Sequence, residues 1–454
     1  MKARAVVSIG VVLSCGVLAG VFNSACSSND TPVAGAPGTA GSNGNNAGTN
    51  TGGSASGGSG TGGSGTGGAA AGSGGMMATG GGLAMIDGKC PPNSIKKMDN
   101  LCYCQPASLS ACVDGCGDFM IDPDHCGNCT TKCKATQACN AGMCGAEPKV
   151  VVPAAAGCES MQIAVQGGNL YYTDKMHGTV SSVPVAGGAA KAIGTTQKAP
   201  TAIKVSATDV FWIASGDKTV MTAPIAGGAP TVIVPAQKDD KQMPVDIGGI
   251  TLSDDGKTLY FSAGTAISKA AVPGGTITPI GKEASGIPRA LAVSGTFVAS
   301  PIEVNGDVDV MVTGGAASVC ASENDVGFTN TACNRLARSQ GSLVFDNIVI
   351  SGDGVYWANG LNISTASASA PSGFNDNVVQ SPTATANTLT AFTVAKNVVY
   401  GADDGGVIFS APLMKDQMPT TMVRGQMKPT SLAADDTNLY WANGDCSILS
   451  IPLK

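Results

Sequence analysis

Hydrophobic and polar positions alternate in short segments over the last two thirds of the chain, and glycine or aspartate separates one segment from the next. The clearest unit has four such segments, at 200–207, 209–215, 218–225 and 230–234. Alternation with a period of two and many β-branched residues predict strands. The glycine pair at 227–228 predicts the turn before the last of them. We therefore expect each unit to form a blade of four antiparallel strands.

The second strand of the unit carries a mostly aromatic motif that recurs along the chain. Successive copies lie 37 to 59 positions apart. The recurring position is occupied by Tyr172, Trp212, Phe261, Val298, Trp357, Tyr400 and Trp441. A repeat of about 40 residues built from strands is typical of a β-propeller. Seven copies predict an all-β, seven-bladed propeller over 147–454, and the regular spacing favours packing between blades over carbohydrate stacking for these aromatic side chains.

The last unit ends on its third strand, so its fourth strand has to come from elsewhere. The segment PKVVVPA at 148–154 closely matches PTVIVPA at 230–236, which is the fourth strand of the clearest unit. We expect residues 148–153 to complete the last blade, which closes the ring and covers an exposed strand edge.

Four cysteines fall within the predicted propeller. Cys158 follows the closing strand, and Cys446 lies in the turn between the second and third strands of the last blade. In an up-and-down blade both connections emerge on the same face, so we expect a Cys158–Cys446 disulfide, with free buried cysteines as the alternative. Cys320 and Cys333 lie in the longest insertion and are expected to form a local bridge.

The motif Tyr171-Tyr172-Thr173-Asp174 and its relative LYWAN at 439–443 resemble the YWTD class of propellers and the related NHL-type repeats. The resemblance spans 148–454 and implies a propeller fold. The YWTD class normally has six blades, one fewer than the copies counted here.

A cysteine-dense segment at 85–146 precedes the propeller. Its ten cysteines are Cys90, Cys102, Cys104, Cys112, Cys116, Cys126, Cys129, Cys133, Cys139 and Cys144. In an exported chain this density predicts a small disulfide scaffold, whose pairing the spacing leaves open. Zinc is the alternative, because the Cys126-x-x-Cys129 spacing beside His125 is that of metal ligands.

Part of this segment, 112–144, resembles the cysteine-rich repeat of the plant Stig1 family. The matching residues are Asp122, His125, Cys126, Gly127, Cys129, Cys133, Cys139 and Cys144. The resemblance implies an extracellular disulfide module without catalysis.

The N-terminus has the features of an export signal at 1–25: two basic residues, a mostly apolar stretch and small residues before Cys26. The sequence around Cys26 resembles a bacterial lipoprotein processing site, which implies lipidation of that cysteine. Cys15 is a rival site, and ordinary secretion or an uncleaved anchor are the alternatives.

Residues 26–84 are mostly small and polar and predict a disordered linker. A linker of this composition resembles those of myxobacterial surface lipoproteins, which implies a lipid anchor at the outer membrane or cell surface. We also expect a monomer.

Composition narrows the function. Charged residues make up 13% of the chain and the net charge is −6, so binding to nucleic acid is not expected and membrane contact is expected through the lipid anchor only. The propeller has one histidine, His177, which we interpret as a turn residue, and no cofactor, metal or catalytic motif is predicted. Aspartate pairs at 254–255, 403–404 and 435–436 are expected to form turns, with calcium binding as the alternative.

We expect a non-catalytic propeller that binds an extracellular protein or glycan. The sequence leaves enzyme activity open. The alternatives are a propeller enzyme of the lyase or lactonase type and a structural spacer in the cell envelope.

Overall fold

The computed structural model describes most of the chain from Leu83 to Leu453. The residues that fall outside the description after Leu83 are 84, 86–88, 99, 113, 160, 283–286, 296, 303–306, 313–317, 320–332, 339–342, 370–375, 384–385 and 454. The export signal, Cys26, Cys320 and nearly all of the predicted linker therefore lie outside the described residues. None of the described residues forms a helix with the length and apolar character needed to cross a bilayer.

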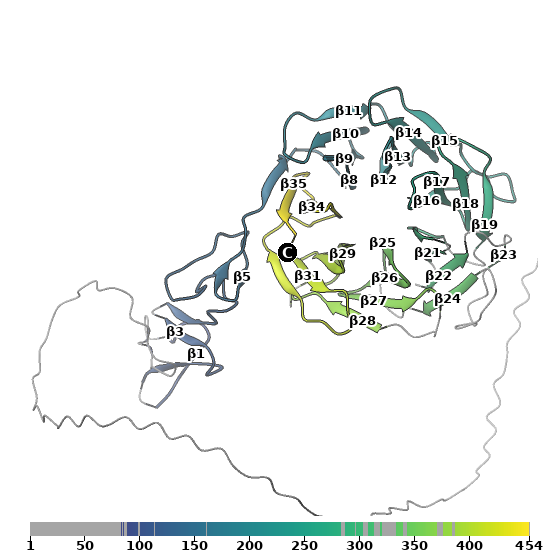
Figure 1. Ribbon diagram of the computed structural model, residues 1–454. Helices are drawn as coiled ribbons and strands as arrows, with labels where there is room; N and C mark the ends of the chain where they lie inside the picture. The colour runs from purple at the N-terminus through teal and green to yellow at the C-terminus, as the bar shows by residue number, and fades with distance from the viewer. Residues whose placement is uncertain are drawn as a thin grey trace, which may run out of the picture. The chain divides into compact units, whose positions relative to one another are not determined.

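The repeat region folds into antiparallel sheets placed around a ring (Figure 1). Six of these sheets have four strands each. The first three are β8 (Ile163–Gln166), β9 (Asn169–Asp174), β10 (Thr179–Pro184) and β11 (Lys191–Gly194); β12 (Pro200–Val205), β13 (Asp209–Ala214), β14 (Thr219–Pro224) and β15 (Thr231–Val234); and β20 (Ala292–Ser294), β21 (Phe297–Pro301), β22 (Asp307–Val312) and β24 (Cys333–Arg338). The other three are β25 (Leu343–Ser351), β26 (Gly354–Asn359), β27 (Asn362–Ser367) and β28 (Asp376–Gln380); β29 (Leu389–Ala395), β30 (Val398–Asp403), β31 (Ile408–Pro412) and β32 (Thr420–Val423); and β33 (Ser431–Ala434), β34 (Asn438–Ala442), β35 (Ile448–Pro452) and β7 (Lys149–Val152).

The expectation of a seven-bladed propeller is wrong. Among the described residues there are six four-stranded blades, and the repeat at Phe261 lies in a sheet of five strands. That sheet consists of β16 (Ile247–Leu252), β17 (Thr258–Ala263), β18 (Ala266–Ala271), β19 (Thr278–Lys282) and β23 (Ser318–Val319). The fifth strand comes from the long insertion and pairs in parallel with β19 through Gly281 and Ser318. Counting aromatic repeats could not reveal this, because β23 carries no copy of the motif.

The ring closes where the sequence comparison places the closure. β7 pairs antiparallel with β35, with Val152 opposite Ile448 and Val150 opposite Leu449. Val151 and Ile448 are buried in one apolar cluster with Leu170 of the first blade. Closure therefore supplies both the missing ladder of hydrogen bonds and part of the core between the first and last blades.

The aromatic repeat builds the core between sheets. Trp212, Trp357 and Trp441 are fully buried, as are Phe261 and Tyr400. Trp212, for example, packs in one cluster with residues of the preceding blade. Side chains buried in this way are not available to stack on a sugar. Tyr172 differs from the others because it is only half-buried.

The cysteine-dense segment forms three short hairpins. They are β1 (Ser94–Lys96) with β2 (Cys102–Cys104), β3 (Ser110–Cys112) with β4 (Gly115–Gly117), and β5 (Cys139–Asn140) with β6 (Met143–Cys144). Strands this short bury little apolar surface, so the cross-links described below supply most of the restraint.

Candidate functional site

The ten cysteines of the module form five disulfides. The pairs are Cys90–Cys102, Cys104–Cys116, Cys112–Cys129, Cys126–Cys139 and Cys133–Cys144. All five close loops of 11 to 17 residues.

These pairings do not fit the zinc alternative. Cys126 and Cys129 are bonded to different partners, and zinc binds the thiolate rather than a disulfide sulfur. The sulfur atoms of Cys126, Cys133 and Cys144 lie within 4.8 Å of one another. Each of them belongs to a disulfide, so this cluster is a product of the cross-links.

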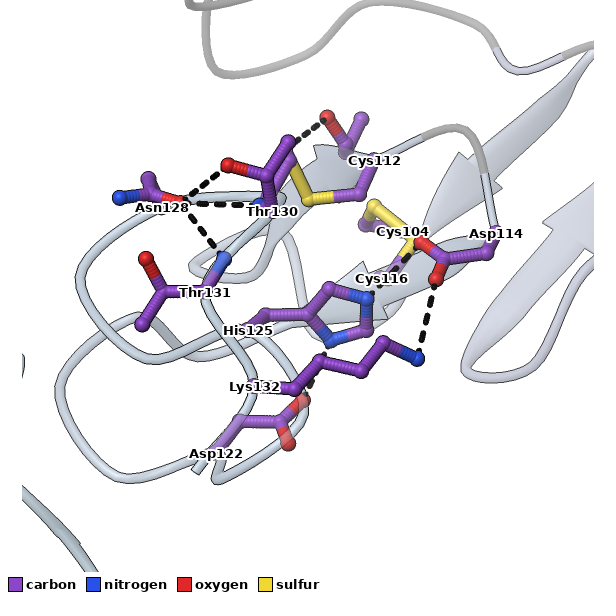
Figure 2. The surroundings of a disulfide bond; sticks show 12 residues. Cys104, Cys112, Asp114, Cys116, Asp122, His125, Asn128, Thr130, Thr131 and Lys132 are labelled. Carbon is purple, nitrogen blue, oxygen red and sulfur yellow. Dashed lines mark hydrogen bonds and ion pairs between the residues drawn. A yellow bond between two sulfur atoms is a disulfide. The ribbon is translucent and has the colours of Figure 1, made fainter. Parts of the chain in front are cut away.

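His125 is held between two carboxylates beside the Cys104–Cys116 and Cys112–Cys129 disulfides (Figure 2). Its Nδ1 lies 2.9 Å from Asp122 Oδ2, and its Nε2 lies 2.9 Å from Asp114 Oδ1. The histidine is buried. A doubly protonated imidazole donates to both acids, whereas a neutral one donates to only one of them.

This arrangement changes the protonation of all three groups. Burial by itself lowers the pKa of His125, but the hydrogen bonds to Asp122 and Asp114 outweigh burial and raise that pKa. The bond from His125 lowers the pKa of Asp114. Burial raises the pKa of Asp122, and the hydrogen bond from His125, with a further one from a backbone N–H, brings it to a net lowering. The triad is thus a charged clamp that joins the segment after β4 to the turn between β3 and β4, and neither ring nitrogen is free for a substrate or a metal.

One rim of the ring carries the connections between neighbouring sheets and the turns between second and third strands; we call it the disulfide rim. Here the structure joins Cys158 to Cys446, whose Cα atoms lie 6.2 Å apart. Cys446 is buried, and the amide of Ala155 donates to the carbonyl of Asp445 nearby. Of the other predicted pair, Cys333 lies in β24 and Cys320 lies outside the described residues.

His177 also lies on the disulfide rim, in the turn between β9 and β10. Its Nδ1 lies 2.7 Å from Asp174 Oδ2, and its backbone N–H donates to Asp174 Oδ1 at 3.0 Å. The imidazole is half-exposed. Lys175, two positions before it, forms an ion pair with Glu159 at 2.9 Å. The aspartate therefore both shapes the turn and orients the ring through Nδ1.

The opposite rim, which carries the turns between first and second strands, contains a cavity of about 480 Å³; we call it the pocket rim. The cavity lies where the first and last sheets meet. It is lined by Val165, Gln166, Gly167, Gly168, Ala434, Asp435, Asp436 and Thr437. Sequence reasoning did not find it, because its two walls lie some 270 residues apart and only ring closure brings them together.

The two aspartates of the pocket differ in whether their carboxylates are already hydrogen-bonded within the protein. Asp435 Oδ1 accepts the backbone N–H groups of Thr437 and Asn438, and its Oδ2 accepts the Tyr440 hydroxyl at 2.7 Å. Burial together with this bond raises the pKa of Tyr440. Asp435 is therefore a turn-forming residue, as predicted for the aspartate pairs. Asp436 is exposed and lines the cavity, and its carboxylate has no hydrogen-bond or ion-pair partner among the described residues.

A second feature missed in the sequence links adjacent blades. Trp212 Nε1 donates to Gln197 Oε1 at 3.0 Å, and Trp441 Nε1 donates to Gln426 Oε1 at 2.8 Å. Each glutamine stands 15 positions before its tryptophan. Their backbone N–H groups donate to the carbonyls of Gly178 and Gly406 in the preceding blade.

These glutamines satisfy indole groups that burial would otherwise leave without a partner. Trp357 illustrates the alternative, because its Nε1 is buried without a hydrogen-bond partner among the described residues. The position 15 residues before it is Ser342, which lies outside them. The constant spacing was the available signal in the sequence.

Fold and site together define the class: a β-propeller preceded by a disulfide-rich module. No family model matches the chain, and no curated protein matches it, so the Stig1-like and YWTD-like resemblances stay predictions. Solved structures do match. A streptogramin B lyase shares 16% identity with a TM-score of 0.51, over 68% of this chain and 97% of that one.

Two further structures show the same likeness. A catalytically inactive histidine variant of virginiamycin B lyase from Staphylococcus aureus, bound to quinupristin, shares 12% identity over 68% of this chain and all of that one, with a TM-score of 0.53. Hydrazine synthase of Kuenenia stuttgartiensis shares 13% identity over 66% and 97% of the two chains, with a TM-score of 0.51. At these identities the comparisons establish the propeller fold alone.

Proposed function

We propose that this protein is an exported, lipid-anchored binding protein without catalytic activity, which presents its propeller to an extracellular protein or glycan. The cavity at the pocket rim carries the proposal. Its lining combines an unpaired carboxylate, Asp436, an exposed amide, Gln166, and the Gly167–Gly168 turn with the apolar side chains of Val165 and Ala434. Binding sites for small ligands combine a few polar groups with apolar side chains in this way.

The histidines support a non-catalytic role. General acid–base catalysis needs a group that can exchange a proton with a bound substrate. Both ring nitrogens of His125 are occupied by carboxylates. His177 is engaged in its own turn through Asp174, and Glu159 is paired with Lys175. Lipid attachment at Cys26 and exposure at the cell surface rest on the N-terminal sequence.

The binding role is tested with the full chain purified in detergent. Thermal shift against arrays of glycans and peptides should find a class that stabilises the wild type, and the double variant Asp436→Asn, Gln166→Ala should lose that response. Asp416→Asn, which alters an exposed carboxylate without a described side-chain partner outside the cavity, is the matched control and should behave as wild type. A ligand that binds the double variant and the wild type equally would place binding elsewhere.

The anchor is tested by radiolabelled palmitate. Incorporation that disappears in Cys26→Ser supports lipidation, and unchanged labelling of that variant rejects it.

A lyase-type enzyme is the second candidate, because the oriented imidazole of His177 lies on a fold shared with streptogramin-type lyases. Incubation with quinupristin followed by mass spectrometry should show no product. Saturable turnover that His177→Ala abolishes would replace the binding proposal with this one.

A further inference from the structure

A lysine lies on the inner wall of the ring. β12 is the innermost strand of its sheet and lies near the centre of the ring in Figure 1, as do β8, β16 and β25. On this strand Ile203 and Val205 pack with Trp212 between two sheets. Lys204 alternates with them, so it points away from that cluster, and its side chain is exposed to solvent.

Lys204 is the one charged residue at its level of the ring. Lys204 lies opposite Phe211, which directly precedes the aromatic repeat residue Trp212. In each other sheet, the equivalent of Lys204 is the first-strand residue that lies opposite the residue before the repeat position. The other six equivalents are neutral: Ala164, Thr251, Ser294, Val349, Val394 and Ala433. A basic residue among neutral neighbours is not part of a charge network that holds the sheets together.

The side chain of Lys204 is exposed to solvent, and protein also surrounds its amine. Surrounding protein removes hydration from the charged form and lowers the pKa of Lys204, and no acidic group contributes to offset this. Among the described residues Lys204 has no hydrogen-bond or ion-pair partner. Both properties are expected of a side chain that projects from an innermost strand into the interior of the ring.

An enclosed cation without a partner is destabilising, because lost hydration is not replaced. Lysine at this position therefore lowers the free energy of unfolding relative to a neutral residue. A group of this kind in a concave site is a candidate for ligand recognition.

We propose that Lys204 recognises a carboxylate of a ligand that enters the interior of the ring. One lysine supplies one positive charge and a compact ammonium group, which matches a single carboxylate. A phosphate dianion would call for a second cation or an arginine fork, and the six equivalent positions offer neither. Lys204 is not among the residues that line the cavity at the pocket rim, so this proposal extends the proposed function and does not depend on it.

The test measures thermal melting of the full chain in detergent with sodium acetate, with inorganic phosphate, and with sodium chloride at the same ionic strength. In the wild type, acetate should raise Tm above the chloride control. Lys204→Met should lose this rise, and Lys204→Arg should keep it because the charge remains. Lys191→Met, on the exposed outer strand β11, is the matched control and should respond as wild type.

Each alternative result overturns the proposal. Acetate that acts no differently from chloride in the wild type, or a rise that persists in Lys204→Met, removes the site. A response to phosphate without one to acetate rejects the carboxylate. Without ligand, Lys204→Met should melt at or above the wild-type temperature, which separates lost binding from misfolding. Asp436→Asn should keep the acetate response even if the pocket-rim proposal fails.

Discussion

Breaking the Cys158–Cys446 disulfide tests how the ring is held closed. The bridge spans 288 residues, whereas those of the module span 11 to 17. In the chain-entropy model a closed loop of this length restricts the unfolded chain by about 19 cal/mol/K, or about 5–6 kcal/mol at 25 °C. Measured effects often fall below this model, so the double variant Cys158→Ala, Cys446→Ala should lose about 2–5 kcal/mol.

The assay is calorimetric melting of the oxidised full chain. At roughly 2 °C per kcal/mol for a domain of this size, Tm should fall by about 4–10 °C. Because unfolding of a large ring is often irreversible, the unfolding rate at a fixed temperature should be compared as well, and it should rise. Each single variant should match the double, since either change breaks the same bond.

A short-loop bridge provides the control. Replacing Cys90 and Cys102, which are 12 positions apart, should remove about 3 kcal/mol by the same model and act on the module. The Tm of the propeller should not change. An unchanged propeller Tm in the Cys158–Cys446 variant, with the bond verified by mass spectrometry in the wild type, would refute the argument that this bridge stabilises the closed ring.

Three further changes test other parts of the structure. His125→Gln should lower the stability of the module most near and below pH 6.5, because a raised pKa makes the charged clamp fully effective there. The difference from wild type should shrink as pH rises through the His125 pKa, and calorimetry between pH 5 and 9 that shows a constant difference would contradict the clamp. Trp441→Ala should cost about 3–5 kcal/mol in urea unfolding, since the side chain is fully buried; a loss below about 1 kcal/mol would contradict its role in the core. Gly406→Ala should cost more than Gly167→Ala: both glycines have positive φ, but only at Gly406 would a Cβ overlap a backbone carbonyl, that of Gln426. Equal Tm values for the two variants would reject that contact.

The sequence revealed features that repeat or that copy one another. The recurring aromatic position predicted the propeller, and the match between 148–154 and 230–236 predicted the pairing of β7 with β35. The order of strands within a blade then placed Cys158 and Cys446 on the same rim, where the structure joins them.

Other features depend on contacts that no local pattern contains. β23 joins another sheet from within an insertion, so counting repeats gave the wrong number of four-stranded blades. Ten cysteines in 55 positions allow many pairings, and spacing does not choose among them. The cavity at the pocket rim and the enclosure of Lys204 arise only when sheets distant in sequence meet.

The pairing of β7 with β35 has a consequence for the order of folding. Synthesis produces β7 first among the ring strands and β35 last, with nearly 300 residues between them. Until the C-terminal segment appears, Val150 and Val152 have no partner strand, and the sheets already formed make an open arc with two bare ends. The nascent chain therefore passes through a stage in which unpaired strand edges are exposed and can pair with other chains. Truncation by even the last six residues would leave the protein at that stage permanently.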